Sequence, residues 1–206
     1  MTTIMDTNNR KLTINDILDQ RAYERVRVVR QAEVFELKSR RRIPLGTIIT
    51  VMFENRVTMQ AQIQEMLRVE KVIGDEGVME ELRAYNPLIP ETGQLCATLF
   101  IELTTDAQVR EWLSKLVGIE RSIGLKLANG EIVNAIVDES HAESLTREHV
   151  TAAVHYVRFE FTSAQVEEFA KGDVQLVSNL PNYLETTELA PHTVAELLTD
   201  LRDINS

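Results

Sequence analysis

The chain changes from a strand-like to a helix-like pattern within the stretch Ile48-Ile49-Thr50-Val51-Met52-Phe53-Glu54-Asn55-Arg56. The apolar run over residues 48–53 is typical of a largely buried strand, and residues 56–73 carry apolar side chains at helical spacing. A helix that begins directly after a strand presents backbone N–H groups without helical partners. Polar groups that bind ligands often lie at such junctions, so this transition is the first candidate for a functional surface.

Other segments show the alternation or the helical spacing of one α+β fold. Residues 95–103 place Leu95, Leu99 and Ile101 on one face, and Asn129-Gly130 is a strong hairpin signal between two apolar runs. In the first long helix, Val28, Ala32 and Phe35 share one face. Strands are predicted over residues 48–53, 95–103, 123–127, 132–137, 154–161 and 174–177. Helices are predicted over residues 21–38, 56–73, 76–85, 106–116 and 163–171 and in the tail.

Strands interrupted by helices, with at least one hairpin, predict an α+β fold with a mainly antiparallel or mixed sheet of five to six strands and helices packed on it. Neither a repeat nor a linker is visible, so we expect a single domain over residues 1–206, with residues 1–13 disordered.

The composition is that of an ordinary soluble protein, with 44% hydrophobic and 26% charged residues. No run approaches the roughly 20 apolar residues of a membrane-spanning helix, and the first residues lack the apolar core of a signal peptide. The single cysteine, Cys96, excludes an internal disulfide and any multi-cysteine metal site made by this chain alone. We therefore expect a cytoplasmic protein without a membrane partner.

Charge is distributed unevenly along the chain. Residues 1–42 hold ten Lys or Arg against six Asp or Glu, a net charge of +4, and the remainder holds twelve against twenty-six, a net charge of −14. This asymmetry predicts either an internal electrostatic contact or a docking surface for an acidic partner. Nucleic acid is not the expected partner, because stacking aromatic groups are missing near the basic run at residues 38–42.

Polar side chains are crowded around the strand-to-helix junction. Asn55 has the alternative role of a helix cap, and Glu65 with Arg68 has the alternative role of a surface pair. Glu70 falls within the apolar stripe of the predicted helix, where a carboxylate needs a partner or a route to solvent. The candidate binding residues at this junction are Glu54, Asn55, Arg56, Gln62, Gln64, Glu65, Arg68 and Glu70.

His155 is expected on the apolar side of its strand, as a core histidine held by one or two hydrogen bonds. The alternative is a proton shuttle or a single metal ligand beside Glu54 or Glu102. If the chain is an enzyme or a small-ligand binder, its polar pocket would gather Glu54, Arg56, Gln62, Glu102 and His155.

The remaining candidates favour ordinary structural roles. His141 and His149 lie among carboxylates at a spacing that matches no established metal site, and Cys96 reads as core packing. Phosphate loops, nucleophile elbows and dinucleotide fingerprints do not occur in the sequence. We therefore predict no cofactor and no metal site and assign no catalytic residue; a metal-dependent protein that uses the two histidines remains a third alternative.

Five runs in combination resemble a bacterial domain of unknown function of similar length, over most of the chain from Ile14 to Leu201. The runs are Phe53-Glu54-Asn55-Arg56, residues 62–68, Tyr85-Asn86-Pro87-Leu88-Ile89-Pro90, residues 97–102 and His155-Tyr156-Val157-Arg158-Phe159. The resemblance implies genes encoded beside rubrerythrin-like proteins and heterodisulfide-reductase-like iron–sulfur proteins, and hence a link to redox or peroxide defence. It supplies neither an activity nor catalytic residues.

The sequence therefore predicts a cytosolic, non-catalytic accessory protein. It would dock through the basic N-terminal helix and the junction at residues 54–68 onto an iron–sulfur or non-haem-iron redox protein. Association with further copies of the chain, as a homo-oligomer, is left open.

Overall fold

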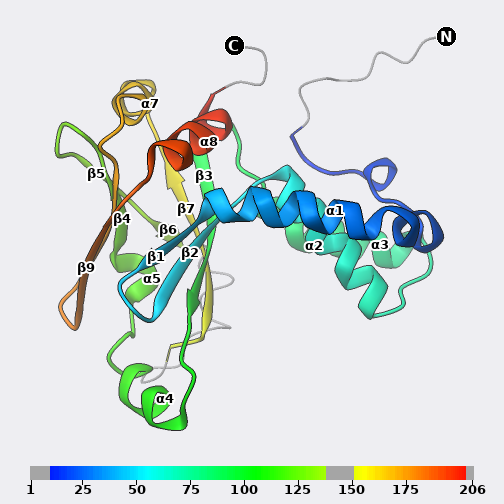
Figure 1. The fold of residues 1–206 in the computed structure, drawn as a ribbon, viewed down its shortest axis with the longest axis horizontal. Helices are drawn as coiled ribbons and strands as arrows, with labels where there is room; N and C mark the ends of the chain where they lie inside the picture. The colour runs from blue at the N-terminus through cyan, green and yellow to red at the C-terminus, as the bar shows by residue number, and fades with distance from the viewer. Residues whose placement is uncertain (1–9, 138–150, 203–206) are drawn as a thin grey trace.

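The computed structural model describes residues 10–137 and 151–202. In these residues, seven α-helices and two antiparallel sheets form an α+β fold, as the sequence predicts. The two sheets lie together in one half of the molecule, and three helices form a lobe beside them (Figure 1).

The first sheet has the strand order β1-β2-β3-β7-β6. Its central strands are apolar on the face that lies toward the second sheet, where Phe53, Ala97 and Val157 align across three strands. The opposite face carries Glu54, Cys96 and neighbouring polar groups. The strands are β1 (Arg42–Leu45), β2 (Ile49–Glu54), β3 (Gln94–Ile101), β7 (Val154–Glu160) and β6 (Ile136–Val137).

The second sheet has the order β5-β4-β8-β9, and the predicted hairpin joins its first two strands. Gly130 adopts a φ of +86° at the turn, a conformation that a side chain would strain. The single strand predicted over residues 132–137 is two strands: its first half pairs with β4, and its last two residues cross to the first sheet and pair with β7. The strands are β4 (Ile123–Lys126), β5 (Ile132–Asn134), β8 (Gln175–Leu180) and β9 (Tyr183–Glu188).

The main core fills the space between the sheets and the helices packed on them. Fully buried aliphatic and aromatic side chains dominate it, including Leu99, Phe159 and Phe169. The helices of this half are α4 (Asp106–Trp112), α5 (Ile119–Ser122), α7 (Ser163–Ala170) and α8 (Pro191–Leu201).

Tyr183 links the two sheets at the β1–β2 turn. Its hydroxyl donates to the Leu45 carbonyl (2.7 Å) and accepts from the Ile48 N–H (3.3 Å), and its side chain is buried. Replacing Tyr183 by Phe leaves both backbone groups without this partner, so we expect the free energy of unfolding to fall by about 1–2 kcal/mol. Urea denaturation measures this loss; an unchanged midpoint would show that the hydroxyl does not support the turn.

The helical lobe has a smaller apolar cluster of its own. Helices α2 (Arg56–Val69) and α3 (Asp75–Tyr85) form it together with residues in and near the 3-10 turns η1 (Ile14–Asp16) and η2 (Asn86–Leu88), and α1 (Gln20–Arg41) packs beside α2. Leu12 is buried in this cluster, and its N–H donates to the Asn86 side chain (2.8 Å). These contacts hold the segment around Leu12 against the lobe, and residues 1–9 lie outside the described residues.

Helix α1 is unusually exposed for its length. Of its 22 residues only Tyr23 and Arg41 are buried, and it extends from the sheets along the lobe (Figure 1). The apolar face identified in the sequence points to solvent, because Val28 and Phe35 are each 77% exposed. Helical spacing shows which side chains share a face, but it does not show what covers that face.

Candidate functional site

The junction between β2 and α2 is a self-contained hydrogen-bonded unit. Glu54 is buried, and its two carboxylate oxygens accept from the hydroxyls of Thr58 (2.7 Å) and Thr98 (2.8 Å). Asn55 is the N-cap of α2 and accepts from the Thr58 N–H (3.0 Å), while the Thr58 hydroxyl accepts from the Asn55 N–H (2.9 Å). These reciprocal bonds begin the helix, as the alternative role of Asn55 predicts.

Two further candidate residues are held by separate ion pairs. Arg56 pairs with Asp16 of η1, on the lobe side of the junction. Glu102 pairs with Arg42 and accepts from the Thr50 hydroxyl (2.8 Å), at the other end of β2. The two groups therefore do not share a site.

Glu65 is the centre of a polar cluster that joins α1 to α2. Its carboxylate accepts from the Tyr23 hydroxyl (2.8 Å), from Arg27 Nε (2.7 Å) and from Arg68 Nε (3.0 Å), and Gln31 lies within hydrogen-bond distance as well (3.2 Å). The hydrogen bond from Arg27, with those from Tyr23 and Arg68, lowers the pKa of Glu65 to about 2 against the opposing effect of burial. Burial and the neighbouring carboxylate raise the pKa of Tyr23 to about 12.

A groove of about 410 Å³ runs beside this cluster, between α1 and α2. Gln62 lies along it, and Gln64 fixes its end by two hydrogen bonds with the backbone of Leu18 (2.8 and 3.1 Å). The groove combines amide and charged groups with apolar ones. Its lining residues include Leu18, Gln31, Val34, Phe35, Lys38, Val57, Gln60, Ala61 and Gln62.

His155, Glu70 and Cys96 lie away from the groove. His155 is buried on the core face of β7, where its Nε2 lies 2.7 Å from the Thr151 hydroxyl and 2.9 Å from the Ala152 carbonyl. Helix α2 ends at Val69, so Glu70 is an exposed C-cap rather than a member of the apolar stripe. Cys96 is buried, and burial raises the pKa of its thiol to about 11.

The structure does not bring the five residues of the predicted polar pocket together. Glu54 and His155 project from opposite faces of the first sheet, because the side chains of Phe53 and His155 share the core face. Arg56 and Glu102 are held by their own partners, and Gln62 lies in the groove. The structure does bring Gln62, Gln64 and Glu65 together, because they line the groove with side chains of α1, and Arg68 donates a hydrogen bond to Glu65.

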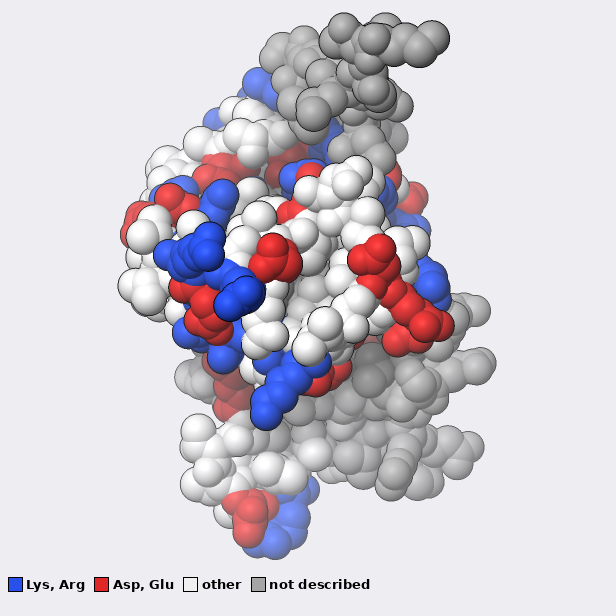
Figure 2. Space-filling model, turned by 90° about the vertical axis from the view of Figure 1, so that its right-hand side faces the viewer, with Lys and Arg blue, Asp and Glu red and all other residues white. Residues whose placement is uncertain are grey.

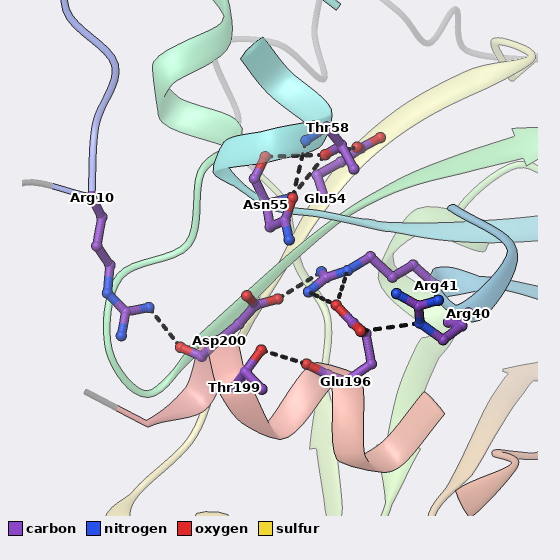
Figure 3. A network of polar contacts seen from close by, with 9 residues as sticks. All are labelled: Arg10, Arg40, Arg41, Glu54, Asn55, Thr58, Glu196, Thr199 and Asp200. Carbon is purple, nitrogen blue, oxygen red and sulfur yellow. Dashed lines mark hydrogen bonds and ion pairs between the residues drawn. The ribbon is translucent and has the colours of Figure 1, made fainter. Parts of the chain in front are cut away.

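A second polar network, absent from the sequence hypotheses, fixes the other end of α1 (Figure 3). Arg41 is fully buried; its Nε donates to Glu196 (3.1 Å) and its Nη1 to Asp200 (2.7 Å). Its Nη2 lies 3.0 Å from Glu196 Oε1 outside hydrogen-bond geometry. Arg40 also contacts Glu196 (3.2 Å), and Arg10 donates to the Asp200 carbonyl (2.6 Å). The only signal for this network in the sequence is the charge asymmetry, which predicted an internal contact as one of two outcomes.

The described residues, 10–137 and 151–202, contain neither a metal-binding cluster nor a membrane-spanning helix. Nowhere in these ranges do three or more His, Cys, Asp or Glu side chains gather in a way that could hold a metal ion. The same residues include no helix that is both long and apolar enough to span a membrane. His141 and His149, the candidate metal ligands of the sequence analysis, lie outside the described residues.

Comparisons with known proteins place this fold among proteins whose role is not established. The sequence model of the family "Protein of unknown function (DUF3501)" matches residues 11–201. A crystal structure of a novel protein of unknown function from Burkholderia pseudomallei is similar at 35% identity and a TM-score of 0.85, over 93% of this chain and 100% of the other. A search of curated proteins returned no match.

Proposed function

The chain belongs to DUF3501, a family of proteins of unknown function, and we propose that it acts as a non-catalytic accessory protein that binds a partner along the groove between α1 and α2. The observation that carries this proposal is the groove itself. It has the size of a binding pocket, and it borders a 22-residue helix of which only two side chains are buried.

The chemistry of the groove fits a helix or an extended segment of another protein. Val34, Val57 and Ala61 offer apolar contacts, and the glutamines at positions 60 and 62 offer amide donors and acceptors. An amphipathic helix binds such grooves through apolar anchors one turn apart, with polar contacts at the rim.

The reactive groups that the structure describes support binding over covalent catalysis. The Glu54 carboxylate is occupied by two threonine hydroxyls, and Glu65 by its cluster on α1 and α2. A thiol with a pKa of about 11, as at Cys96, is protonated near neutral pH and is a poor nucleophile.

The partner that we propose is an iron–sulfur or non-haem-iron redox protein of the cytoplasm. Two points support this partner class: the neighbouring genes that the family resemblance implies, and the charge pattern of the lobe. Helix α1 holds seven Lys or Arg against three Asp or Glu, and α3 holds four Asp or Glu against one Arg. In Figure 2, which looks at this end of the molecule, a group of basic side chains and a group of acidic side chains flank uncharged surface. A partner with opposite charges on either side of an apolar segment fits this arrangement.

A single charge in the groove tests the binding surface. Val57 is 46% exposed in the first turn of α2, so Val57→Glu places a carboxylate where the helix N-terminus tolerates it. We expect this change to weaken binding of a purified rubrerythrin-like or iron–sulfur protein from the same host by about tenfold or more, because the new carboxylate must lose water on binding. Isothermal titration calorimetry measures the affinity.

Leu184→Glu is the matched control, since Leu184 is 69% exposed on β9 in the other half of the molecule. Its affinity should equal that of the unmodified chain. Equal affinity for the Val57→Glu protein would rule out the groove, and failure of every such redox protein to bind the unmodified chain would rule out the proposed partner class.

A further inference from the structure

The outward face of α1 carries a continuous apolar row. Val28, Ala32 and Phe35 follow one another at spacings of four and three residues, so they form one stripe along the helix. Val28 and Phe35 are 77% exposed, and Ala32 is exposed as well. Tyr23, which contacts α2, lies on the other side of the helix, so Val28 and Ala32 are turned away from the lobe, and Phe35 lies at the rim of the groove.

Charged residues of both signs flank this stripe in a distinctive order. At 3.6 residues per turn, Arg25 and Glu36 fall on one flank of the stripe, and Glu24 and Lys38 fall on the other. On the first flank the positive residue comes first along the chain, and on the second flank the negative residue comes first. All four lie at the surface or partly at the surface of the described structure.

This order is complementary to itself when two copies of the helix lie antiparallel. We place a two-fold axis at the level of Gln31, perpendicular to both helices. A residue that precedes Gln31 in one copy then lies beside a residue that follows Gln31 by nearly the same number of positions in the other copy. Each flank of one helix meets the same flank of the other. Arg25 then faces Glu36 of the second copy, and Glu24 faces Lys38 of the second copy. Because each contact occurs twice, four pairs of opposite charge flank the apolar row.

The apolar row fits the same arrangement. Val28 lies three residues before Gln31 and Phe35 four residues after it, so each valine packs beside a phenylalanine of the other helix. A parallel arrangement would instead bring the first flank of one helix against the second flank of the other, and would place Phe35 beside Phe35 and Val28 beside Val28. The pairing of each phenylalanine with the smaller valine therefore favours the antiparallel pair, in which the flanking charges are complementary as well.

We propose that α1 forms an antiparallel homodimer of this chain through the seam of Val28, Ala32 and Phe35. The dimer goes beyond the proposed function, because the seam lies on a different face of α1 from the Tyr23–Glu65 contact and has a different occupant. Phe35 and Lys38 also border the groove, so the second helix would lie along one rim of it and add to its wall.

Sedimentation equilibrium of the full chain tests the dimer. We expect the unmodified chain to dimerise with a Kd below about 100 µM. Val28→Glu places a carboxylate against the opposing phenylalanine, and Arg25→Glu places two carboxylates together on one flank. Each change should raise the Kd of the dimer by about tenfold or more.

A charge exchange tests the register of the two helices. The double variant Arg25→Glu with Glu36→Arg restores opposite charges only if these two positions meet across the dimer, so its Kd should return to within about threefold of the original value. Leu184→Glu, on the sheet, should leave the Kd unchanged, and far-UV circular dichroism checks that each variant keeps its helices.

Three outcomes would overturn the proposal. They are a chain that stays monomeric above about 100 µM, a dimer whose Kd does not respond to Val28→Glu, and a double variant as weak as Arg25→Glu. None of them depends on the redox partner, because the measurement uses the chain alone.

Discussion

Replacing Arg41 by Ala is expected to lower the free energy of unfolding by about 3–5 kcal/mol, the cost of breaking a buried ion pair by removing one partner. The change leaves Glu196 and Asp200 at the interface of α1 and α8 without the cation that fixes them. Burial already raises the pKa of Asp200 against the effect of Arg41, so an unpaired carboxylate there would be more costly still. Urea denaturation at pH 7, followed by far-UV circular dichroism, measures the loss.

Arg40→Ala is the matched control for this change. Arg40 contacts the same Glu196, but its side chain is 35% exposed, so water can replace the lost contact. We expect a loss of about 1 kcal/mol or less for Arg40→Ala. Equal losses for the two variants would show that Arg41 contributes only as a surface charge does.

Replacing Glu65 by Gln is expected to lower the free energy of unfolding by about 1.5–3 kcal/mol at pH 7, because a charged acceptor of hydrogen bonds from Tyr23, Arg27 and Arg68 becomes neutral. The lower end of this range is expected, since the Glu65 side chain is 27% exposed and partly screened by water. Glu33→Gln is the control and should change little, as Glu33 makes an exposed pair with Arg30 at 3.6 Å.

The effect of Glu65→Gln should depend on pH in a defined direction. The pKa of Glu65 is lowered from 4.5 to about 2 in the folded chain, so its stabilisation is complete above the unfolded value and is lost as the pH falls from about 4.5 toward 2. The difference in unfolding free energy between the two proteins should therefore shrink over this range. A difference that stays constant down to pH 2.5 would contradict the role of the charge.

Strands with strong apolar alternation were predictable, and two strands at the sheet edges were not. The alternating face of Leu95, Leu99 and Ile101 predicts β3, and Asn129-Gly130 predicts the β4–β5 hairpin, as observed. Strand β1 begins at an arginine and contains Pro44, and β9 is polar along most of its length. Both are edge strands, where a proline is tolerated and one face is solvated, so local sequence carries little signal of them.

At the candidate site, roles set by local sequence were predictable and roles set by distant contacts were not. Asn55 as a helix cap, the Glu65–Arg68 pair and the buried position of His155 follow from spacing within one element, and the structure confirms them. The contacts of Glu65 with Tyr23 and Arg27 join residues about forty positions apart, and those of Arg41 with α8 join residues more than 150 apart. Hydrophobic periodicity carries no information about such pairings.

The passage of the chain from β5 to β6 has a consequence for how the sheets find their alignment. Only Ala135 separates residues paired in one sheet from residues paired in the other. A slip of one residue in either ladder would turn every side chain of residues 132–137 to the wrong face. The shift would then pass directly to the ladder of the other sheet. The registers of the two ladders are therefore coupled, so that correct pairing in one sheet excludes a shifted register in the other.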